Sequence, residues 1–411
     1  MKLSRSIFAF LSALLLVVSC GKDDPVVPPD DGKDPASALQ EKPSLKAAVE
    51  AMASAAVKEA PRLAGVEVWQ EGYRSSGAWP GGSAGQRHQV WSVTKSFTSL
   101  AVGIAVGEGR LRLDEKVAGL FPSQAAAASK SMKYNSKAMT EAQKANMEAV
   151  TVEHLLTMTG GHRKDPTSEY AEKYALTIAL GYRKYLKDDG VDAAALLSDL
   201  GTDIPELFFG YPFDAEPGTR YCYDSFGSCM LAEILKLKTG MDVADYLGER
   251  LFRPMGLDKP QWDKAGKDVS SGGWGLHLTT GEMVSFGRLV LGGGVWEGKR
   301  LVPEQYMAAA VSSRTDHLSH SGKDYGTDGY GYQFWTRDDG AFVMCLGLFG
   351  QYIIAIPSKQ AVIALVSDMP VLPSQADLSD LPGVIGAFTG GASAQAEDVL
   401  ELTWKYIVPA L

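Results

Sequence analysis

The sequence predicts an α+β fold in which one antiparallel sheet is flanked by helices, with a mostly helical subdomain inserted beside it. An alternating run at 63–69 is typical of a strand near the start of the folded chain. Four short β-rich runs follow one another closely near the end, at 331–337, 341–348, 351–356 and 362–367. The region between them consists mainly of helical segments separated by Gly- and Pro-rich loops. Because strands lie at both ends of this region, we expect them to meet in one sheet.

The size and charge of the chain limit the number of domains and the kinds of partner that it can have. Its 411 residues, 45% of them hydrophobic, are enough for a sizeable core. We expect one folded domain at 44–411, with the sheet part at about 44–91 and 325–411 and the helical part at about 92–324. The net charge of −9, with no basic tract to offset it, argues against nucleic acid as a partner.

The first residues have the pattern of an export signal. Lys2 and Arg5 precede an apolar run at 7–18 that is too short to span a bilayer comfortably. A small residue directly before Cys20 resembles the processing site of bacterial lipoproteins, which implies removal of residues 1–19 and lipid on Cys20. An ordinary signal that happens to contain a cysteine is the alternative. The Asp-, Lys- and Pro-rich residues that follow, up to Pro43, predict a flexible linker over 20–43.

Helix start and stop signals order the middle of the chain. Ser44 is a candidate cap for an alanine-rich helix at 44–60. Thr151 is typical of a helix start, with a glutamate downstream within reach. Further helices are predicted at 97–106, at 225–238 ending at Gly240, at 242–251, at 279–291 and at 396–407.

Ser92 and Lys95 lie three residues apart at the start of the helix-like run 97–106. At that spacing a hydroxyl and an amine share one face of a helix. The helix N-terminus adds N–H groups that favour a developing negative charge, and a desolvated lysine can take the serine proton near neutral pH. The pattern is weak by itself, because Ser19 and Lys22 repeat it within the export signal and a serine can simply cap a helix.

Five segments, the first of which contains this pair, follow one another along the chain: Trp91–Ser96, Thr151–Gly160, Pro217–Tyr223, Tyr246–Leu257, and Gly272–Trp274 leading to Gly281–Met283. In this order the sequence resembles the serine β-lactamase-like hydrolases, which include class C β-lactamases, D-alanyl-D-alanine carboxypeptidases, and related esterases and amide hydrolases. The resemblance covers roughly 50–410 and implies their β-lactamase/transpeptidase-like fold.

The resemblance implies roles for three residues and shows two departures. It makes Ser92 the nucleophile, Lys95 its partner and base, and Tyr223 the residue that shares proton transfer to the leaving group. Where the family has an asparagine two residues after that tyrosine, this chain has Ser225, which offers one donor instead of two. Where β-lactamases have a strand lysine that helps bind a substrate carboxylate, this chain has Cys345.

The segment after Cys345 resembles a particular branch of the family. Its Gly-x-x-Gly-Gln pattern, starting at Gly347, is similar to 6-aminohexanoate-oligomer hydrolases and carboxylesterases. The alignment predicts an oxyanion hole made by the backbone N–H groups of Ser92 and Leu348. Substrate contacts are expected from Ser225, Gly347, Phe349 and Trp274, with His277 also near the pocket.

The remaining histidines, aromatics and cysteines are interpreted as structural. His88 precedes Ser92 by four residues, but no Gly-x-Ser-x-Gly surrounds the serine, so a histidine-dependent triad is not favoured. His317 and His320 lie in a Ser/Gly-rich stretch that predicts a surface loop and not a metal site. No metal or other cofactor is expected. Tyr332 and Trp335 are expected on a sheet face. Cys222, Cys229 and Cys345 are expected to be buried thiols, although a Cys222–Cys229 disulfide is left open.

The sequence therefore predicts a lipid-anchored serine hydrolase of the bacterial cell envelope, expected at the outer membrane, with its periplasmic or surface orientation left open. The expected partners are a small-molecule or short-peptide ester or amide and the membrane. Two alternatives remain. One is a penicillin-binding D-Ala-D-Ala peptidase or weak β-lactamase, and the other is a catalytically silent binding lipoprotein on the same fold.

Overall fold

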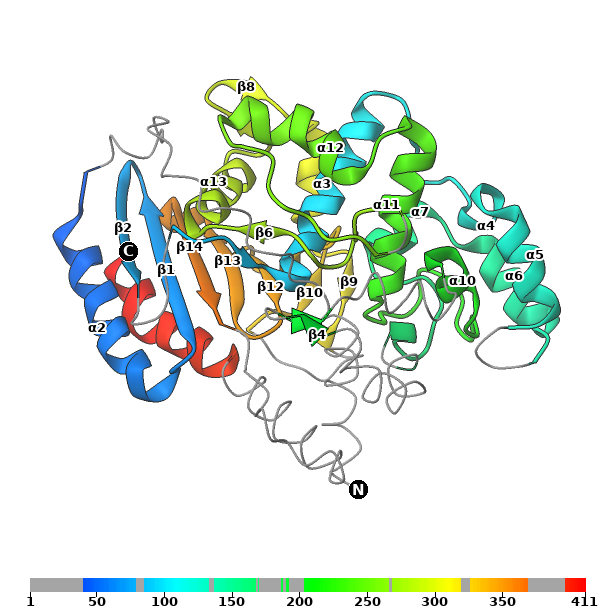
Figure 1. Cartoon of the computed structure of the whole chain (residues 1–411), viewed down its shortest axis with the longest axis horizontal. Coiled ribbons are helices and arrows are strands. Elements are labelled where there is room, and N and C mark those ends of the chain that lie inside the picture. Colours follow the sequence, from blue (N-terminus) through cyan, green and yellow to red (C-terminus); the bar gives the residue numbers. More distant parts are fainter. Residues whose placement is uncertain are drawn as a thin grey trace.

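The two ends of the folded chain meet in one antiparallel sheet, as the strand pattern predicts (Figure 1). This computed structural model describes residues 40–78, 85–132, 137–167, 169, 186–187, 190–191, 203–265, 268–318, 326–368 and 396–411. The predicted signal at 1–19, Cys20 and most of the predicted linker lie outside these residues.

The sheet has 8 strands in the order β2-β1-β14-β13-β12-β11-β10-β9. The first and last long strands of the chain, β1 and β14, pair next to the β2 edge, and Val66 lies opposite Leu365. The bounds are β1 Leu63–Gln70, β2 Tyr73–Ala78, β9 Thr315–Asp316, β10 Gly329–Tyr330, β11 Trp335–Thr336, β12 Val343–Gly347, β13 Gln351–Ile356 and β14 Ala361–Ser367. Two-stranded ribbons are formed by β3 His88–Gln89 with β6 His277–Leu278, by β4 Leu186–Lys187 with β5 Gly190–Val191, and by β7 Val295–Trp296 with β8 Lys299–Arg300.

Each face of the sheet has its own apolar core. On one face, α2 Pro43–Glu59 lies beside the C-terminal helical turns, which comprise a helix at 396–402, η7 Thr403–Ile407 and η8 Val408–Ala410 (Figure 1). Val66 and Val68 of β1 belong to that core, whereas Ala64 belongs to the other core. A regular strand would put Ala64 on the same face as Val66 and Val68, but the register of β1 shifts between Leu63 and Gly65, so Ala64 faces the other core. The helix α13 Thr280–Leu291 covers the second face.

The helical part lies to the side of the sheet away from β2 (Figure 1). Its central helices are α3 Thr94–Gly107 and α11 Ser225–Thr239, both largely buried. The others are α4 Val117–Leu120, α5 Pro122–Lys130, α6 Glu141–Ala149, α7 Val152–Leu156, α10 Ile204–Phe209, α12 Val243–Leu247 and α14 Glu304–Ala310, with short turns η2 Trp91–Val93, η3 Gly248–Phe252 and η4 Arg253–Met255. A further short turn, η5 Pro357–Lys359, joins β13 to β14 in the sheet. The architecture is therefore α+β with a helical insertion, as predicted.

Most helices begin and end where the sequence predicts, but two N-terminal caps differ from the prediction. Thr279 caps α13 in a capping box with Glu282, and α11 ends at Gly240, whose φ is 75°. Ser44 is not a cap, because α2 begins one residue earlier with Pro43 in its first turn. At α7 the capping box of Thr151 is closed by the His154 side chain and not by a glutamate, because His154 occupies the third helical position.

The first of the four late β-rich runs is shorter than predicted. Only Trp335 and Thr336 form a strand, because residues 331–334 make a tight loop around Gln333. Gln333 has a φ of 62°, and its buried side chain donates to the carbonyls of Leu155 and Leu156 at 3.0 and 2.9 Å. Tyr332 consequently does not lie on a sheet face, whereas Trp335 does. The Tyr332 hydroxyl instead donates to the Glu153 carboxylate.

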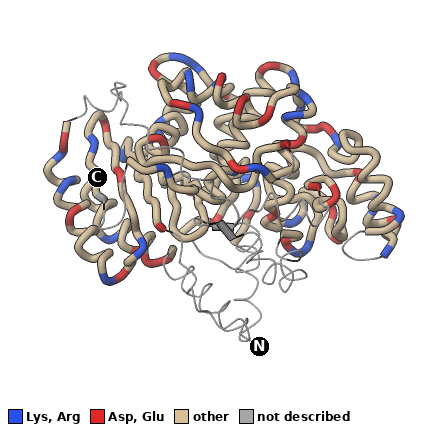
Figure 2. Tube along the Cα trace, in the orientation of Figure 1, with Lys and Arg blue, Asp and Glu red and all other residues tan. Residues whose placement is uncertain are grey.

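Charged residues lie mainly in the outer helices and loops (Figure 2). Strands β12, β13 and β14 carry none, and α3 carries one, Lys95. In the part of the chain that the structure describes, no helix has the length and apolar character needed to cross a bilayer. Cys222, Cys229 and Cys345 are free thiols, so the Cys222–Cys229 bridge is not formed.

Candidate active site

Ser92 occupies an exceptional position on a buried segment. It lies in the turn η2 that leads into α3, and it is the one residue from Val90 to Ala105 that is not buried. Trp91, directly before it, has a φ of 52°, a conformation that bulky residues rarely adopt. The chain therefore holds this hydroxyl at the surface of the core through a strained turn, a kind of strain that is found at functional sites.

Lys95 contacts Ser92 from inside the protein. Its Nζ lies 2.9 Å from Ser92 Oγ and 2.8 Å from the carbonyl oxygen of Gly273, and the residue is only 1% exposed. Burial lowers the pKa of Lys95 to about 8, although the charges of Cys229, Asp165 and Asp224 act in the opposite direction. The Gly273 carbonyl takes one N–H of the amine. The nitrogen lone pair of the neutral amine is then able to accept the serine proton.

Tyr223 approaches the same lysine from the start of α11. Its ring centroid lies 4.9 Å from Lys95 Nζ, and the ring stacks on Trp335 at 6.0 Å. Tyr223 directly precedes Asp224, the N-cap of α11. The structure thus brings together Ser92, Lys95 and Tyr223, the three residues that the sequence predicts to be catalytic.

The end of β12 closes on the Ser92 turn. A Cβ atom on Gly347 would lie 2.3 Å from the carbonyl oxygen of Val90, so only glycine allows this approach. Beyond it, Leu348 is half-buried and Phe349 has a φ of 64°. The rings of Phe349 and Trp91 meet edge to face at 5.1 Å. Two strained aromatic residues therefore pack together, one beside Ser92 and the other beside Leu348.

Gly347→Ala is expected to damage both the site and the fold. The added methyl group must push Val90, and with it the Ser92 turn, away from β12. We expect a loss of about 2 kcal/mol in the free energy of unfolding and about a hundredfold loss in turnover of an activated ester. Thermal unfolding and steady-state kinetics measure the two effects. Gly119→Ala is the control, since no atom lies within 4 Å of its added Cβ, and equal behaviour of the two variants would contradict the expectation.

The residues predicted to bind substrate are placed differently from one another. Gly347 lies at the β12 end, and Ser225 is the buried first residue of α11, packed against Gly273. Trp274 and Phe349 are 1% and 0% exposed, so both side chains belong to the core instead of lining an open surface. Cys345 is also buried, and burial raises the pKa of its thiol to about 12. A neutral thiol therefore occupies the strand position where the resemblance has a lysine.

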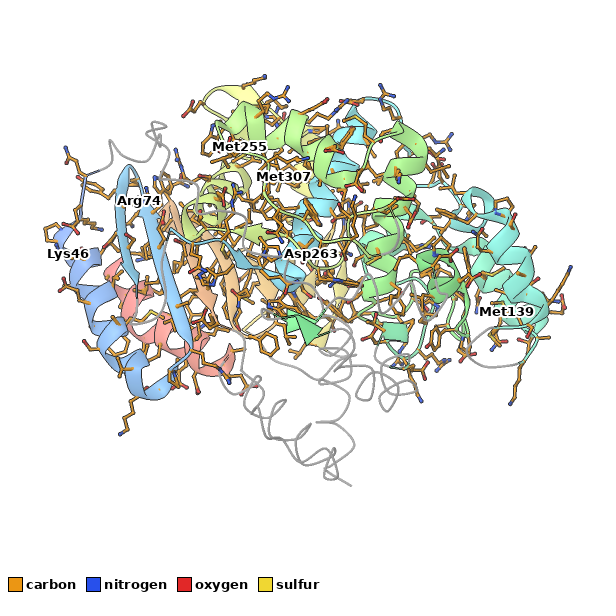
Figure 3. All side chains as sticks on the ribbon, viewed as in Figure 1. Lys46, Arg74, Met139, Met255, Asp263 and Met307 are labelled. Carbon is orange, nitrogen blue, oxygen red and sulfur yellow. The ribbon has the colours of Figure 1, made fainter. Side chains whose placement is uncertain are left out.

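The histidines take structural positions. His277 lies 3.0 Å from Asp263, whose position Figure 3 marks, and His88 lies in β3 with its Nδ1 3.6 Å from Asp368. His317 is fully buried and 2.9 Å from Thr327 Oγ1, so the predicted surface loop is wrong at this residue. His320 lies outside the described residues.

One important contact was not predicted from the sequence. The Gly273 carbonyl anchors Lys95 from 178 residues away. The Gly272–Trp274 segment was noted only as part of a motif, and a backbone oxygen leaves no signal in a residue pattern. The strained φ of Trp91 is equally invisible, because the sequence offers a tryptophan where glycine would be expected.

Comparison with known proteins defines the family. The β-lactamase family model matches residues 48–380, which is most of the chain. The protein belongs to the β-lactamase family. It is thus a β-lactamase-fold member of a family of serine hydrolases, in agreement with the resemblance stated from the motifs.

Relatives within the β-lactamase family have several different names. The 6-aminohexanoate-dimer hydrolase of Paenarthrobacter ureafaciens is 24% identical over 378 residues, covering 89% of this chain and 86% of the relative. Penicillin-binding protein 4 of Amycolatopsis lactamdurans is 27% identical over 326 residues, covering 70% and 73%. Among solved structures, a putative 6-aminohexanoate-dimer hydrolase from Bacillus anthracis matches with a TM-score of 0.54 at 18% identity, covering 82% of this chain and 80% of that chain, and this similarity concerns the fold alone.

Proposed function

We propose that this protein hydrolyses an ester or amide through an acyl-Ser92 intermediate. The observation that carries the proposal is the buried amine of Lys95, 2.9 Å from Ser92 Oγ, with a pKa lowered to about 8. Such an amine is neutral in a useful fraction of molecules near neutral pH, and it can activate a serine hydroxyl that is otherwise a weak nucleophile.

The proposed reaction has two halves. Ser92 Oγ attacks the carbonyl carbon while Lys95 Nζ takes the serine proton. The N–H groups of Ser92 and Leu348 are assigned to the oxyanion, because the close approach of Gly347 to Val90 brings their segments together. Tyr223 passes a proton to the leaving alcohol or amine as its bond to the carbonyl carbon breaks. Water then attacks acyl-Ser92, giving up a proton to the same groups, and releases the acid and the free serine.

The substrate is expected to be a neutral ester or amide. Strand β12 carries no charged side chain, so it offers no cation to a substrate carboxylate. This feature disfavours the penicillin-binding peptidase and the β-lactamase. The similarity to a 6-aminohexanoate-dimer hydrolase over 89% of the chain supports an amide or ester of a small molecule or short peptide.

A fluorophosphonate probe tests the enzyme assignment directly. Mass spectrometry of the treated protein should find one adduct, on the peptide that contains Ser92. Absence of any adduct would favour the catalytically silent lipoprotein. Turnover of a D-Ala-D-Ala peptide at a rate above that of short acyl esters would favour the peptidase.

The pH dependence of kcat/KM is expected to follow Lys95. Its pKa of about 8 belongs to a base that must be neutral to act, so kcat/KM should rise as the pH increases through about 8. Steady-state kinetics from pH 5 to 10 with a neutral ester measure this limb. A limb near pH 6 with no further rise would point instead to a histidine base.

We also propose that the protein is anchored to the cell envelope by lipid on Cys20, outside the described residues. The support is the sequence pattern of residues 1–20 alone. Cys20→Ala should move the protein from the membrane fraction to the soluble fraction after expression in a Gram-negative host. An unchanged distribution between the fractions would contradict the lipid anchor but would not affect the hydrolase proposal.

A further inference from the structure

The loop that carries Tyr223 is held along its length by a second segment, residues 158–162. The N–H groups of Ala215, Gly218 and Cys222 donate to the carbonyls of Gly161, Thr159 and Met158 at 3.0, 2.9 and 2.8 Å. The N–H of Asp224 reaches the Met158 sulfur at 3.2 Å. Both neighbours of Tyr223 are therefore tied to the same methionine, which itself has a strained φ of 58°.

Asp224 connects this loop to α11 and to His162. One carboxylate oxygen, Oδ1, accepts the N–H of Gly227 at 2.9 Å and so caps the helix. The other, Oδ2, lies 3.1 Å from His162 Nδ1. Both side chains are buried, at 8% and 2% exposure. Each oxygen of this buried carboxylate thus has its own partner, as a charge in the interior requires.

Within the described residues, the one hydrogen bond of the His162 side chain is that to Asp224. Its ring lies between Phe208 and Phe213, at centroid distances of 5.1 and 4.3 Å. Its Nε2 is buried and has no hydrogen-bond partner within the described part of the chain. An apolar side chain would fill this space without an unsatisfied nitrogen. At this distance Nδ1 can donate an N–H to the Asp224 carboxylate.

We propose that His162 and Asp224 form a positioning pair that holds Tyr223 against Lys95, an inference that rests on the proposed function. Neither residue contacts the reacting atoms. His162 fixes the Asp224 carboxylate, Asp224 fixes the start of α11, and Tyr223 directly precedes it in the chain. Its ring is already within 4.9 Å of the Lys95 nitrogen. An error of about 1 Å in such a group can reduce turnover about a hundredfold.

The pair has an electrostatic consequence as well. The Asp224 charge raises the pKa of Lys95 and so partly opposes the larger effect of burial, together with Cys229 and Asp165. Among the described residues, the Tyr223 ring also lies against the lysine. Removing the Asp224 charge while keeping its cap should therefore make the lysine a base at lower pH.

Two substitutions at His162 separate a positioning role from a simple packing role. Asparagine places an amide N–H close to the position of Nδ1, whereas leucine fills the space without a donor. We expect His162→Leu to lower kcat about tenfold to a hundredfold with KM within about threefold, and His162→Asn to recover most of the loss. The assays are turnover of a p-nitrophenyl ester and the rate of fluorophosphonate labelling, with circular dichroism of each variant. If His162→Leu has the same kcat as the wild type, or if both variants lose the same amount of kcat, the proposed positioning role of His162 and Asp224 is wrong.

Asp224→Asn keeps the test decisive if His162→Leu fails to fold. The amide oxygen can still accept from Gly227, but the charge is gone. The acid limb of kcat/KM should then move to lower pH, and an unmoved limb would overturn the inference. Wild-type protein that never reacts with the fluorophosphonate would instead defeat the proposed function, and the positioning role with it.

Discussion

Ser92→Ala is expected to abolish fluorophosphonate labelling and to reduce ester turnover by about 10⁴-fold or more. The alanine lacks the oxygen that forms the acyl intermediate. Ser96, one turn along α3, donates its hydroxyl to the Gln333 carbonyl at 2.7 Å and is buried. Labelling followed by mass spectrometry, together with steady-state kinetics, measures the loss.

Ser96→Ala is the matched control for this experiment. It removes a serine hydroxyl from the same helix, and it should lower the free energy of unfolding by about 1 kcal/mol through loss of one buried hydrogen bond. Labelling at Ser92 should persist. If labelling survives in Ser92→Ala, or disappears equally in both variants, the acyl-Ser92 intermediate is wrong.

Lys95→Met should have opposite effects on activity and on stability. Methionine has a similar length and no charge, so Ser92 loses its base and acylation should slow by about 10³-fold. The buried lysine itself destabilises the wild type, since lowering its pKa from about 10.4 in the unfolded chain to about 8 corresponds to about 3 kcal/mol. Loss of the hydrogen bonds to Gly273 and Ser92 offsets part of this, leaving a net gain of about 1 kcal/mol for the variant at pH 7.

The lowered pKa of Lys95 also predicts how the free energy of unfolding changes with pH. Between about pH 8 and 10.4 the unfolded wild type binds the Lys95 proton and the folded protein does not. The free energy of unfolding of the wild type should therefore rise with pH across that window, while Lys95→Met shows no such contribution. Urea unfolding of both proteins at pH 7 and pH 10 tests this. A variant that is less stable at pH 7 and keeps the same difference at pH 10 would show that the lysine is not desolvated as described.

Much of the fold was predictable because local signals and the final structure agree. The helix at Ser225–Thr239 ends at a glycine, the helix after Thr279 has its capping box, and the late strands alternate toward two cores. The loop at residues 331–334 was mistaken for a strand. Its conformation is set by hydrogen bonds from Gln333 to residues nearly 180 positions earlier, and no local pattern encodes such contacts.

In the candidate site, too, local contacts could be predicted from the sequence and contacts between distant segments could not. The spacing of Ser92 and Lys95 predicts their contact, since both residues belong to one turn of chain. The anchoring of Lys95 by Gly273 and the burial of Trp274 and Phe349 depend on how distant segments pack. Aromatic residues next to a motif were expected to touch substrate, but here they support the backbone. Phe349 packs edge to face on Trp91, so the two residues with positive φ on either side of the site support each other.

The pairing of β1 with β14 also determines when the protein can become active. Residues 63–70 emerge from the ribosome early, but their partner strand at 361–367 comes almost three hundred residues later. The Leu348 segment that faces the nucleophile is likewise made late. The hydroxyl is therefore present long before the surroundings that would make it reactive. A nascent chain therefore lacks the assembled Ser92 site until nearly its whole length is available to fold.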